Sequence, residues 1–319
     1  MKLLVVGGTS FVGRHAVEHA VEAGHDVTVF HRGRTNDDLL AGRIEHRHGD
    51  RTTGDYASLD TDETWDAVID VSAYFPRAVE QLADVLDGRA GHCVHISSIS
   101  AYDDAAITPD EDSPLYADLA DPTEEAVTGE TYGPLKAMCE RAAVQRFGAP
   151  HTTVIRPTYV IGPWDKTDRF TYWVRRMERG GDVAVVSPDA PLQVIDGRDL
   201  GTFMVRCAVD TTPGAFDGVG PHAPLSELLA QLTPEGVGHR LVDVGGAALD
   251  AAGVVLPLLS TEEVPEAFLA RPGIDARAAG LTTRPLADTV ADLRAWDADR
   301  GTPPLVVGPT PDEERALLA

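Results

Sequence analysis

The first 34 residues decide the fold, and they read MKLLVVGGTSFVGRHAVEHAVEAGHDVTVFHRGR. The apolar run 2–6 predicts a β-strand, and the glycine-rich stretch 7–13 predicts a tight turn. Apolar residues at helical spacing predict a helix over 14–23, and the apolar run 27–30 predicts a second strand. A strand, a glycine-rich turn, a helix and a strand in this order form the βαβ unit that binds nucleotides in many proteins.

The glycines of this turn follow the pattern G-x-x-S-x-x-G. Gly7 permits a tight bend, and Gly13 allows the helix to pack closely on the sheet. Backbone N–H groups at a helix start suit a pyrophosphate, and the Ser10 hydroxyl can donate to the same group. The alternative is an ordinary strand-to-helix turn. The predicted dinucleotide contacts in this stretch are Gly7, Thr9, Ser10, Phe11, Val12 and Gly13.

The end of the second expected strand bears on the choice of cofactor. His31, Arg32 and Arg34 follow the strand, and no carboxylate stands where an NAD-preferring site accepts from the ribose 2′-OH. Arginine matches a 2′-phosphate, so these residues predict NADP(H) binding over NAD(H). The alternative is that the arginines are solvated loop charges. Asp50, after a strand expected over 43–47, is placed to meet an adenine edge or to serve as a turn residue.

Composition narrows the class of protein. The chain has 319 residues, 43% of them hydrophobic, and a formal net charge of −24, which argues against nucleic-acid binding. Its lysines are Lys2, Lys136 and Lys166, and excess acid with so few lysines resembles proteins from salt-adapted (halophilic) cells. No stretch approaches the ~20 apolar residues of a membrane span. The three cysteines lie far apart, so we expect reduced thiols and a cytoplasmic location.

Strand and helix patterns alternate along the chain. Strands are expected over 65–71, 92–96 and 151–156, and helices over 76–86 and 130–147. This alternation predicts an α/β fold, a Rossmann-type doubly wound parallel sheet.

The domain organisation follows from where the alternation loosens. We expect a cofactor-binding domain over 1–165, to which 190–215 returns, and a smaller C-terminal substrate lobe over 166–319. Gly214 to Gly220 is interpreted as a turn-rich connection. The acidic, proline-bearing stretch 103–130 predicts a long loop, either a solvated insertion or a lid.

One constellation carries chemistry. Tyr132 and Lys136 lie four residues apart, which places them on one face of a helix. A neighbouring ammonium favours the phenolate of a tyrosine, which can then exchange a proton with an alcohol or a carbonyl near neutral pH. Ser98, at the end of the strand expected over 92–96, can hydrogen-bond the same substrate oxygen. These residues predict hydride transfer at a carbinol carbon. The alternative is an exposed tyrosine beside a surface lysine.

Several motifs together resemble extended short-chain dehydrogenases/reductases of the NAD-dependent epimerase/dehydratase family. The resemblance rests on the stretches 7–13, 156–163 and 194–200, on Ser97-Ser98 followed by Tyr102, and on Tyr132 with Lys136. It implies a catalytic triad of Ser98, Tyr132 and Lys136, selects Ser98 over Ser97 by its spacing to Tyr102, and implies a cofactor contact at Pro157. Most members act on nucleotide sugars. The acidic loop keeps a reductase acting on a smaller, neutral carbonyl compound open.

Two classes of function remain. The first is an NAD(P)-dependent oxidoreductase or epimerase that takes a small-molecule substrate. The second is a cofactor-binding sensor or RNA-associated relative, since the opening residues are also similar to chloroplast stem-loop RNA-binding proteins. His15 and His19 lack the Glu of an H-E-x-x-H motif, and His92 and His95 fall on opposite faces of an expected strand. We therefore expect no metal. Whether the chain forms a homodimer stays open.

Overall fold

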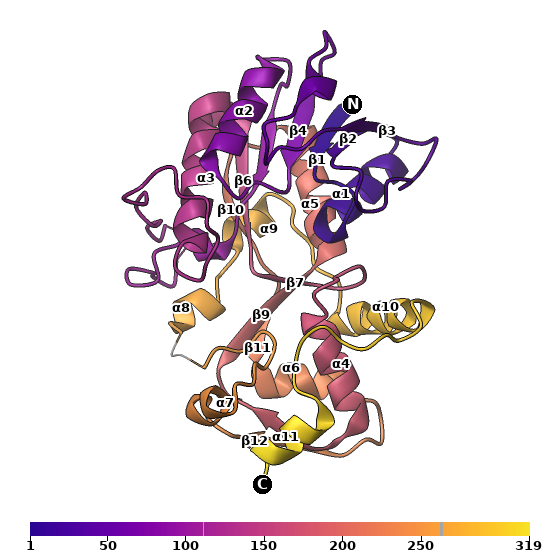
Figure 1. The fold of residues 1–319 in the computed structure, drawn as a ribbon, viewed down its shortest axis with the longest axis vertical. Coiled ribbons are helices and arrows are strands. Elements are labelled where there is room, and N and C mark those ends of the chain that lie inside the picture. The colour runs from indigo at the N-terminus through magenta and orange to yellow at the C-terminus, as the bar shows by residue number, and fades with distance from the viewer. Residues whose placement is uncertain (111, 262–263) are drawn as a thin grey trace. The chain divides into compact units, whose positions relative to one another are not determined.

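The computed structural model describes residues 1–110, 112–261 and 264–319, and the chain divides into two compact units (Figure 1). Unit 1 comprises Met1–Thr158, Gly197–Val219 and Pro272–Thr282, and unit 2 comprises the remainder. The first segment of unit 1 ends at Thr158, whereas the sequence predicted a boundary at residue 165. The segment that returns to unit 1 is Gly197–Val219, whereas the sequence predicted a return over 190–215. The short return of Pro272–Thr282 has no counterpart among the predictions.

Unit 1 is built on a seven-stranded parallel sheet in the order β10-β6-β5-β4-β1-β2-β3. The strands are β1 Lys2–Val6, β2 Asp26–His31, β3 Glu45–His48, β4 Ala67–Asp70, β5 Cys93–Ile96, β6 Thr152–Pro157 and β10 Gly214–Gly218. The predicted doubly wound α/β fold is confirmed. The strand order reverses beside β1, and ligands of such sheets bind outside the carboxyl ends of the strands at this point.

Helices cover both faces of this sheet. Its helices are α1 Phe11–Glu22, α2 Pro76–Leu86, α3 Tyr132–Phe147, α5 Gly197–Asp210 and α9 Ile274–Ala278, with short 3-10 turns at Ala57–Leu59, Ile99–Ala101 and Ala149–His151. Helices α2 and α3 pack together on one face, and α1 and α5 on the other (Figure 1). A Cβ on Gly201 would lie 2.7 Å from the amide nitrogen of Ala16, so this glycine permits the close approach of α5 to α1.

The expected turn-rich connection over 214–220 is wrong, because Gly214–Gly218 forms the edge strand β10 and pairs in parallel with β6. Glycines there look like turn residues in the sequence. In the structure, a Cβ on Gly218 would lie 2.8 Å from Cγ2 of Ile155, so packing against the neighbouring strand requires the glycine. The described residues of 103–130 form a mostly exposed loop with one isolated bridge, Tyr102 to Leu115. Residue 111 of this loop lies outside the described residues.

Unit 2 holds two small sheets, ordered β11-β9-β7 and β12-β8. Its elements are β7 Tyr159–Ile161, α4 Arg169–Arg179, β8 Gly181–Val185, β9 Pro191–Asp196, β11 His222–Pro224, α6 Leu225–Leu232, β12 His239–Asp243, α7 Gly246–Ala252, α8 Glu266–Leu269, α10 Leu286–Asp299 and α11 Pro311–Leu317. Trp173 of α4 is fully buried in the core of this unit, where its indole N–H donates to the carbonyl of Pro257 at 2.7 Å.

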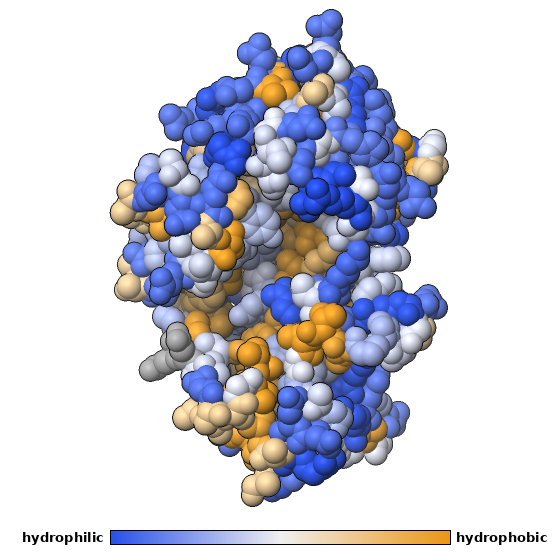
Figure 2. Space-filling model, in the orientation of Figure 1, coloured by the Kyte–Doolittle hydropathy of each residue, from blue (hydrophilic) through white to orange (hydrophobic). Residues whose placement is uncertain are grey.

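Two surface properties complete the description. Among the described residues, no helix combines the length and apolar character needed to cross a bilayer. Figure 2 shows hydrophilic residues over much of the visible surface of unit 1, in keeping with the net charge of −24.

Candidate active site

A cavity of about 400 Å³ opens in unit 1 at the carboxyl ends of β1, β2 and β4. Six of the predicted cofactor contacts line it: Gly7, Thr9, Ser10, His31, Arg32 and Arg34. Five others are not among its lining residues: Phe11, Val12, Gly13, Asp50 and Pro157. The cavity therefore lies at the strand ends where the sequence predicts the dinucleotide.

The glycine-rich turn has the geometry of an anion site. Gly7 adopts φ +89°, and a Cβ there would lie 2.5 Å from Oγ of Ser72. A Cβ on Gly13 would lie 2.5 Å from the carbonyl oxygen of Gly7, so Gly13 allows the helix to approach the turn itself. Ser10 is the N-cap of α1 and makes no side-chain capping bond, and the first turn holds no acidic residue. The N–H groups that start α1 therefore suit a pyrophosphate.

Arg51 lines the same cavity, and the sequence patterns did not predict it as a site residue. Its guanidinium donates to both carboxylate oxygens of the buried Asp70, at 3.0 Å from Nη2, and to Oγ of Ser72 at 3.3 Å. Burial alone would raise the pKa of Asp70, but the charge and hydrogen bonds of Arg51 lower it below its usual value. A carboxylate inside the apolar strand β4 was the available signal, since a buried charge needs a partner.

His31 is part of a hydrogen-bonded chain at the end of β2. Its Nδ1 accepts from the Gly33 N–H at 3.1 Å, and its Nε2 lies 2.8 Å from Nδ1 of His46. Burial and the neighbouring imidazoles lower the pKa of His31 to about 4, so the ring is neutral and carries its proton on Nε2. The side chains of His31, Asp37 and His48 lie close enough together to hold a metal ion. The Nε2 of His31 carries a proton, however, and a protonated nitrogen is not a metal ligand. The geometry favours a structural role for His31.

Asp50 serves as a turn residue in this structure. Its Oδ1 accepts from the backbone N–H of Thr52 at 3.0 Å and from the Thr52 hydroxyl at 2.6 Å. These bonds lower the pKa of Asp50. Its Oδ2 lies 3.8 Å from the exposed guanidinium of Arg34. The expected adenine contact at Asp50 stays a prediction.

Lys136 is buried, and its ammonium ties two strand ends together. Nζ donates to the carbonyls of Ala73, just after β4, at 3.0 Å and of Ile96, the last residue of β5, at 2.8 Å. Burial lowers the pKa of Lys136 below its usual value. Its Nζ lies 5.6 Å from the ring centre of Tyr74, and the Tyr74 and Tyr132 rings lie 6.4 Å apart. Tyr74 also lines the cofactor cavity, so it links the cavity to the predicted Tyr132/Lys136 pair.

The two serines after β5 have different partners. The Ser97 hydroxyl donates to the buried carboxylate of Glu140, whereas the Ser98 hydroxyl oxygen accepts from the Ser100 N–H at 3.1 Å. Because Ser98 accepts this bond, its own proton stays available for a ligand. A Cβ on Gly133 would lie 2.3 Å from the Ser100 carbonyl oxygen. Gly133 thus lets the first turn of α3, which carries Tyr132, lie against the turn after Ser98.

A buried ionic network supports this turn, and sequence reasoning missed it. Arg156 donates to the carboxylate of Glu140, at 2.7 Å from Nη2, and to the Tyr102 hydroxyl at 2.9 Å. The Tyr102 hydroxyl in turn donates to Asp217 of β10 at 2.8 Å. Ser97 completes the network through Glu140. Its members are up to 120 positions apart in sequence, and only the polar residues Arg156 and Glu140 within apolar segments hinted at it.

The sheet and its turn define a Rossmann-type α/β protein. The family model described as "NAD dependent epimerase/dehydratase family" matches residues 3–211. The chain belongs to the NAD-dependent epimerase/dehydratase family, as the resemblance predicted.

The individual proteins to which the chain is similar have low sequence identity to it. The chain is 26% identical over 207 residues to the chloroplast stem-loop binding protein of 41 kDa b from Arabidopsis thaliana; the match covers 60% of this chain and about half of the relative's length. Among solved structures, the Bordetella bronchiseptica enzyme WbmH in complex with NAD+ is similar, with TM-score 0.68, 17% identity, and 94% and 99% of the two chains covered. A nucleoside-diphosphate-sugar epimerase from Pseudomonas aeruginosa has TM-score 0.68, 20% identity, and 94% and 98% coverage. These structural likenesses concern the fold.

Proposed function

We propose that the chain is a nicotinamide-dependent oxidoreductase or epimerase that moves a hydride at a carbinol or carbonyl carbon of a sugar-like or other small substrate. The observation that carries the proposal is Lys136, a buried ammonium that holds the ends of two strands beside Tyr132 and the cavity-lining Tyr74. A buried ammonium is costly, and neither of its two hydrogen-bond acceptors carries a charge to balance it. Family membership supports an enzymatic role.

Each residue of the proposed triad has a distinct task. Ser98 donates its hydroxyl proton to the substrate oxygen and fixes its position. Tyr132 accepts the proton of the carbinol in one direction and returns it to the carbonyl oxygen in the other. Two of the three ammonium protons of Lys136 are bound to carbonyls, so the third remains to hold a ribose hydroxyl. The positive charge of Lys136 favours the phenolate of Tyr132. A bound nicotinamide would supply the hydride acceptor and donor.

Replacing Tyr132 with phenylalanine tests this assignment. We expect Tyr132→Phe to bind the dinucleotide with unchanged Kd and to lose turnover by about 10²–10⁴-fold, the usual contribution of a positioned acid–base group. The substrate panel comprises nucleotide sugars and small neutral alcohols and aldehydes, followed by the absorbance of the reduced cofactor. The matched control is Tyr116→Phe, a phenol whose hydroxyl faces Asp104 in the loop. Full activity of Tyr132→Phe would refute the assignment.

We infer a preference for NADP(H) from the same cavity. Arg32 and Arg34 line it, and both are exposed enough to reach a 2′-phosphate. A charged hydrogen bond contributes about 1.5–3 kcal/mol, and solvent exposure places these arginines at the low end. We expect NADP+ to bind about tenfold more tightly than NAD+ in calorimetry, and Arg34→Gln to reduce this ratio. Equal affinities in the unmodified protein would overturn the preference.

An RNA-associated role is the second candidate, because the curated relative from Arabidopsis is named as a stem-loop binding protein. The net charge of −24 opposes contact with a phosphate backbone. Retention of a stem-loop RNA by the full chain at moderate salt, together with unchanged behaviour of Tyr132→Phe in every turnover assay, would favour this role. Failure to retain RNA with loss of turnover in the variant would favour the enzyme.

A further inference from the structure

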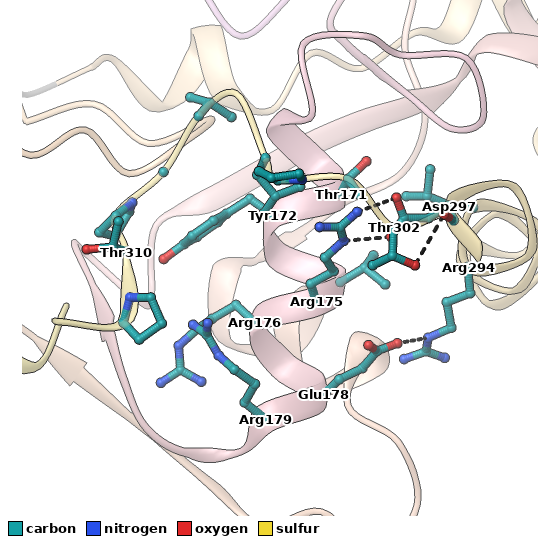
Figure 3. A pocket seen from close by; sticks show the side chains of 18 of the residues that line it. Thr171, Tyr172, Arg175, Arg176, Glu178, Arg179, Arg294, Asp297, Thr302 and Thr310 are labelled. Atoms are coloured by element: carbon teal, nitrogen blue, oxygen red, sulfur yellow. Dashed lines mark hydrogen bonds and ion pairs between the residues drawn. The ribbon is translucent and has the colours of Figure 1, made fainter. Parts of the chain in front are cut away.

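Unit 2 contains a second cavity, of about 630 Å³, between helices α4 and α10 and the segment 302–311 (Figure 3). Its volume falls within the range of small-molecule sites. It shares no lining residue with the cofactor cavity of unit 1. Apolar side chains among its lining residues are Leu293, Pro304, Leu305, Val307, Pro309 and Pro311. Three arginines of α4 also line it: Arg175, Arg176 and Arg179.

Tyr172 is the unusual residue of this cavity. Only 2% of it is exposed, and its hydroxyl has no hydrogen-bond partner among the described residues. In Figure 3 this hydroxyl points into the space between Thr310 and the guanidinium groups of Arg176 and Arg179. The ring itself is fixed, because a Cβ on Gly308 would lie 2.3 Å from it. A buried hydroxyl aimed into a cavity without a partner is costly, which indicates a ligand that accepts its proton.

The charges beside this hydroxyl leave one positive charge in excess. Arg176 and Arg179 share the single carboxylate of Glu314, so two positive charges meet one negative charge. Both Glu314 oxygens are engaged by Nε of Arg176 at 2.6 Å. The other ion pairs at and beside the cavity are balanced in charge. Arg294 pairs with Glu178, and the two cations Arg175 and Arg300 pair with the two carboxylates of Asp297 and Asp168. In a chain with net charge −24, this surplus of positive charge lies near the Tyr172 hydroxyl (Figure 3).

We propose that the cavity of unit 2 binds a small organic monocarboxylate, whose carboxylate accepts from the Tyr172 hydroxyl and from Arg179 while its apolar body packs against Leu293 and Leu305. Arg179 is half-exposed, and its only ion-pair partner among the residues that the structure describes is Glu314 at 3.3 Å, so its remaining N–H groups are available. One negative charge matches the surplus. A phosphate dianion would exceed it and meet Glu314.

Binding of simple probes to the full chain, without any dinucleotide, tests the proposal independently of the proposed enzymatic function. The probes are butyrate and benzoate, with benzyl alcohol as the neutral counterpart of benzoate and inorganic phosphate as the dianion. We expect saturable binding of at least one carboxylate by calorimetry in low-chloride buffer, at least tenfold tighter than benzyl alcohol and phosphate. Absence of saturable binding for both carboxylates would overturn the proposal.

Three variants locate the binding. Tyr172→Phe keeps the ring under Gly308 but removes the hydroxyl, and Arg179→Gln removes the available guanidinium; each is expected to weaken the carboxylate about tenfold. Arg294→Gln is the matched control, because this arginine lines the same cavity but is engaged by Glu178 and the Leu232 carbonyl. Carboxylate binding unchanged by Arg179→Gln would refute the site even if Tyr172→Phe failed to fold. Equal losses in all three variants would also count against it.

Discussion

The buried pair of Arg156 and Glu140 makes a quantitative prediction about what holds the candidate active site in place. Glu140→Gln keeps the shape of the side chain but leaves the guanidinium of Arg156, whose side chain is 10% exposed, without its direct counter-charge. Removing one partner of a buried ion pair typically costs about 3–5 kcal/mol of unfolding free energy. Arg156 keeps its bond to the Tyr102 hydroxyl, and Asp217 lies one hydrogen bond further on. We therefore expect the lower end, about 3 kcal/mol.

The measurement must report on unit 1 separately, because a chain of two units need not unfold in one step. Denaturant-dependent hydrogen exchange of peptides from β5 and α3 satisfies this requirement. The matched control is Asp84→Asn, which removes a carboxylate from the exposed pair with Arg146 and is expected to cost less than 1 kcal/mol. The double variant Glu140→Leu, Arg156→Met should lose less than either single change. A loss for Glu140→Gln no larger than that of Asp84→Asn would refute the reasoning.

Three further predictions concern the turn, the pH response and salt. Gly133→Ala places a Cβ against the Ser100 carbonyl and should reduce turnover at least tenfold without changing dinucleotide Kd, whereas Gly129→Ala meets open space and should have no effect in the same assays. Since the pKa of His31 is about 4 in the folded state and near 6.5 unfolded, the unfolded chain binds more protons between these values. The unfolding free energy of unit 1 should therefore fall as pH drops from 6.5 to 4, and less so in His31→Gln; parallel pH profiles would contradict this. We also propose that the acidic surface reflects adaptation to salt, so the unfolding midpoint should rise from dilute to molar KCl, and a falling midpoint would exclude it.

The sequence predicted the framework of unit 1 well, because strand and helix periodicity is local. The helix expected over 76–86 matches α2, Pro76–Leu86, and the first four strands lie within a few residues of their predicted positions. The edge strand β10 was missed because glycines that are required by packing against Ile155 resemble turn glycines. The small strands of unit 2 were largely missed, since three-residue strands such as β7 carry too little pattern to recognise.

The residues of the candidate site also differ in how far they could be predicted from local sequence patterns. Residues whose expected role depends on neighbours in sequence, such as the turn at Gly7 and the pair Tyr132 and Lys136, could be proposed from spacing. Residues whose role depends on distant partners were not: Arg51 needs Asp70 on another strand, and nothing local relates the two positions.

The two adjacent serines show why both kinds of information are needed. Spacing to Tyr102 favoured Ser98 over Ser97 only by resemblance to a family. The structure supplies a physical reason, because the Ser97 hydroxyl is engaged by Glu140, which Arg156 holds in place from β6. A hydroxyl that donates to a buried carboxylate cannot also donate to a substrate oxygen. If the proposed triad operates, the network that stabilises the turn also leaves Ser98 rather than Ser97 with a proton to donate, and a change at Glu140 should affect stability and turnover together.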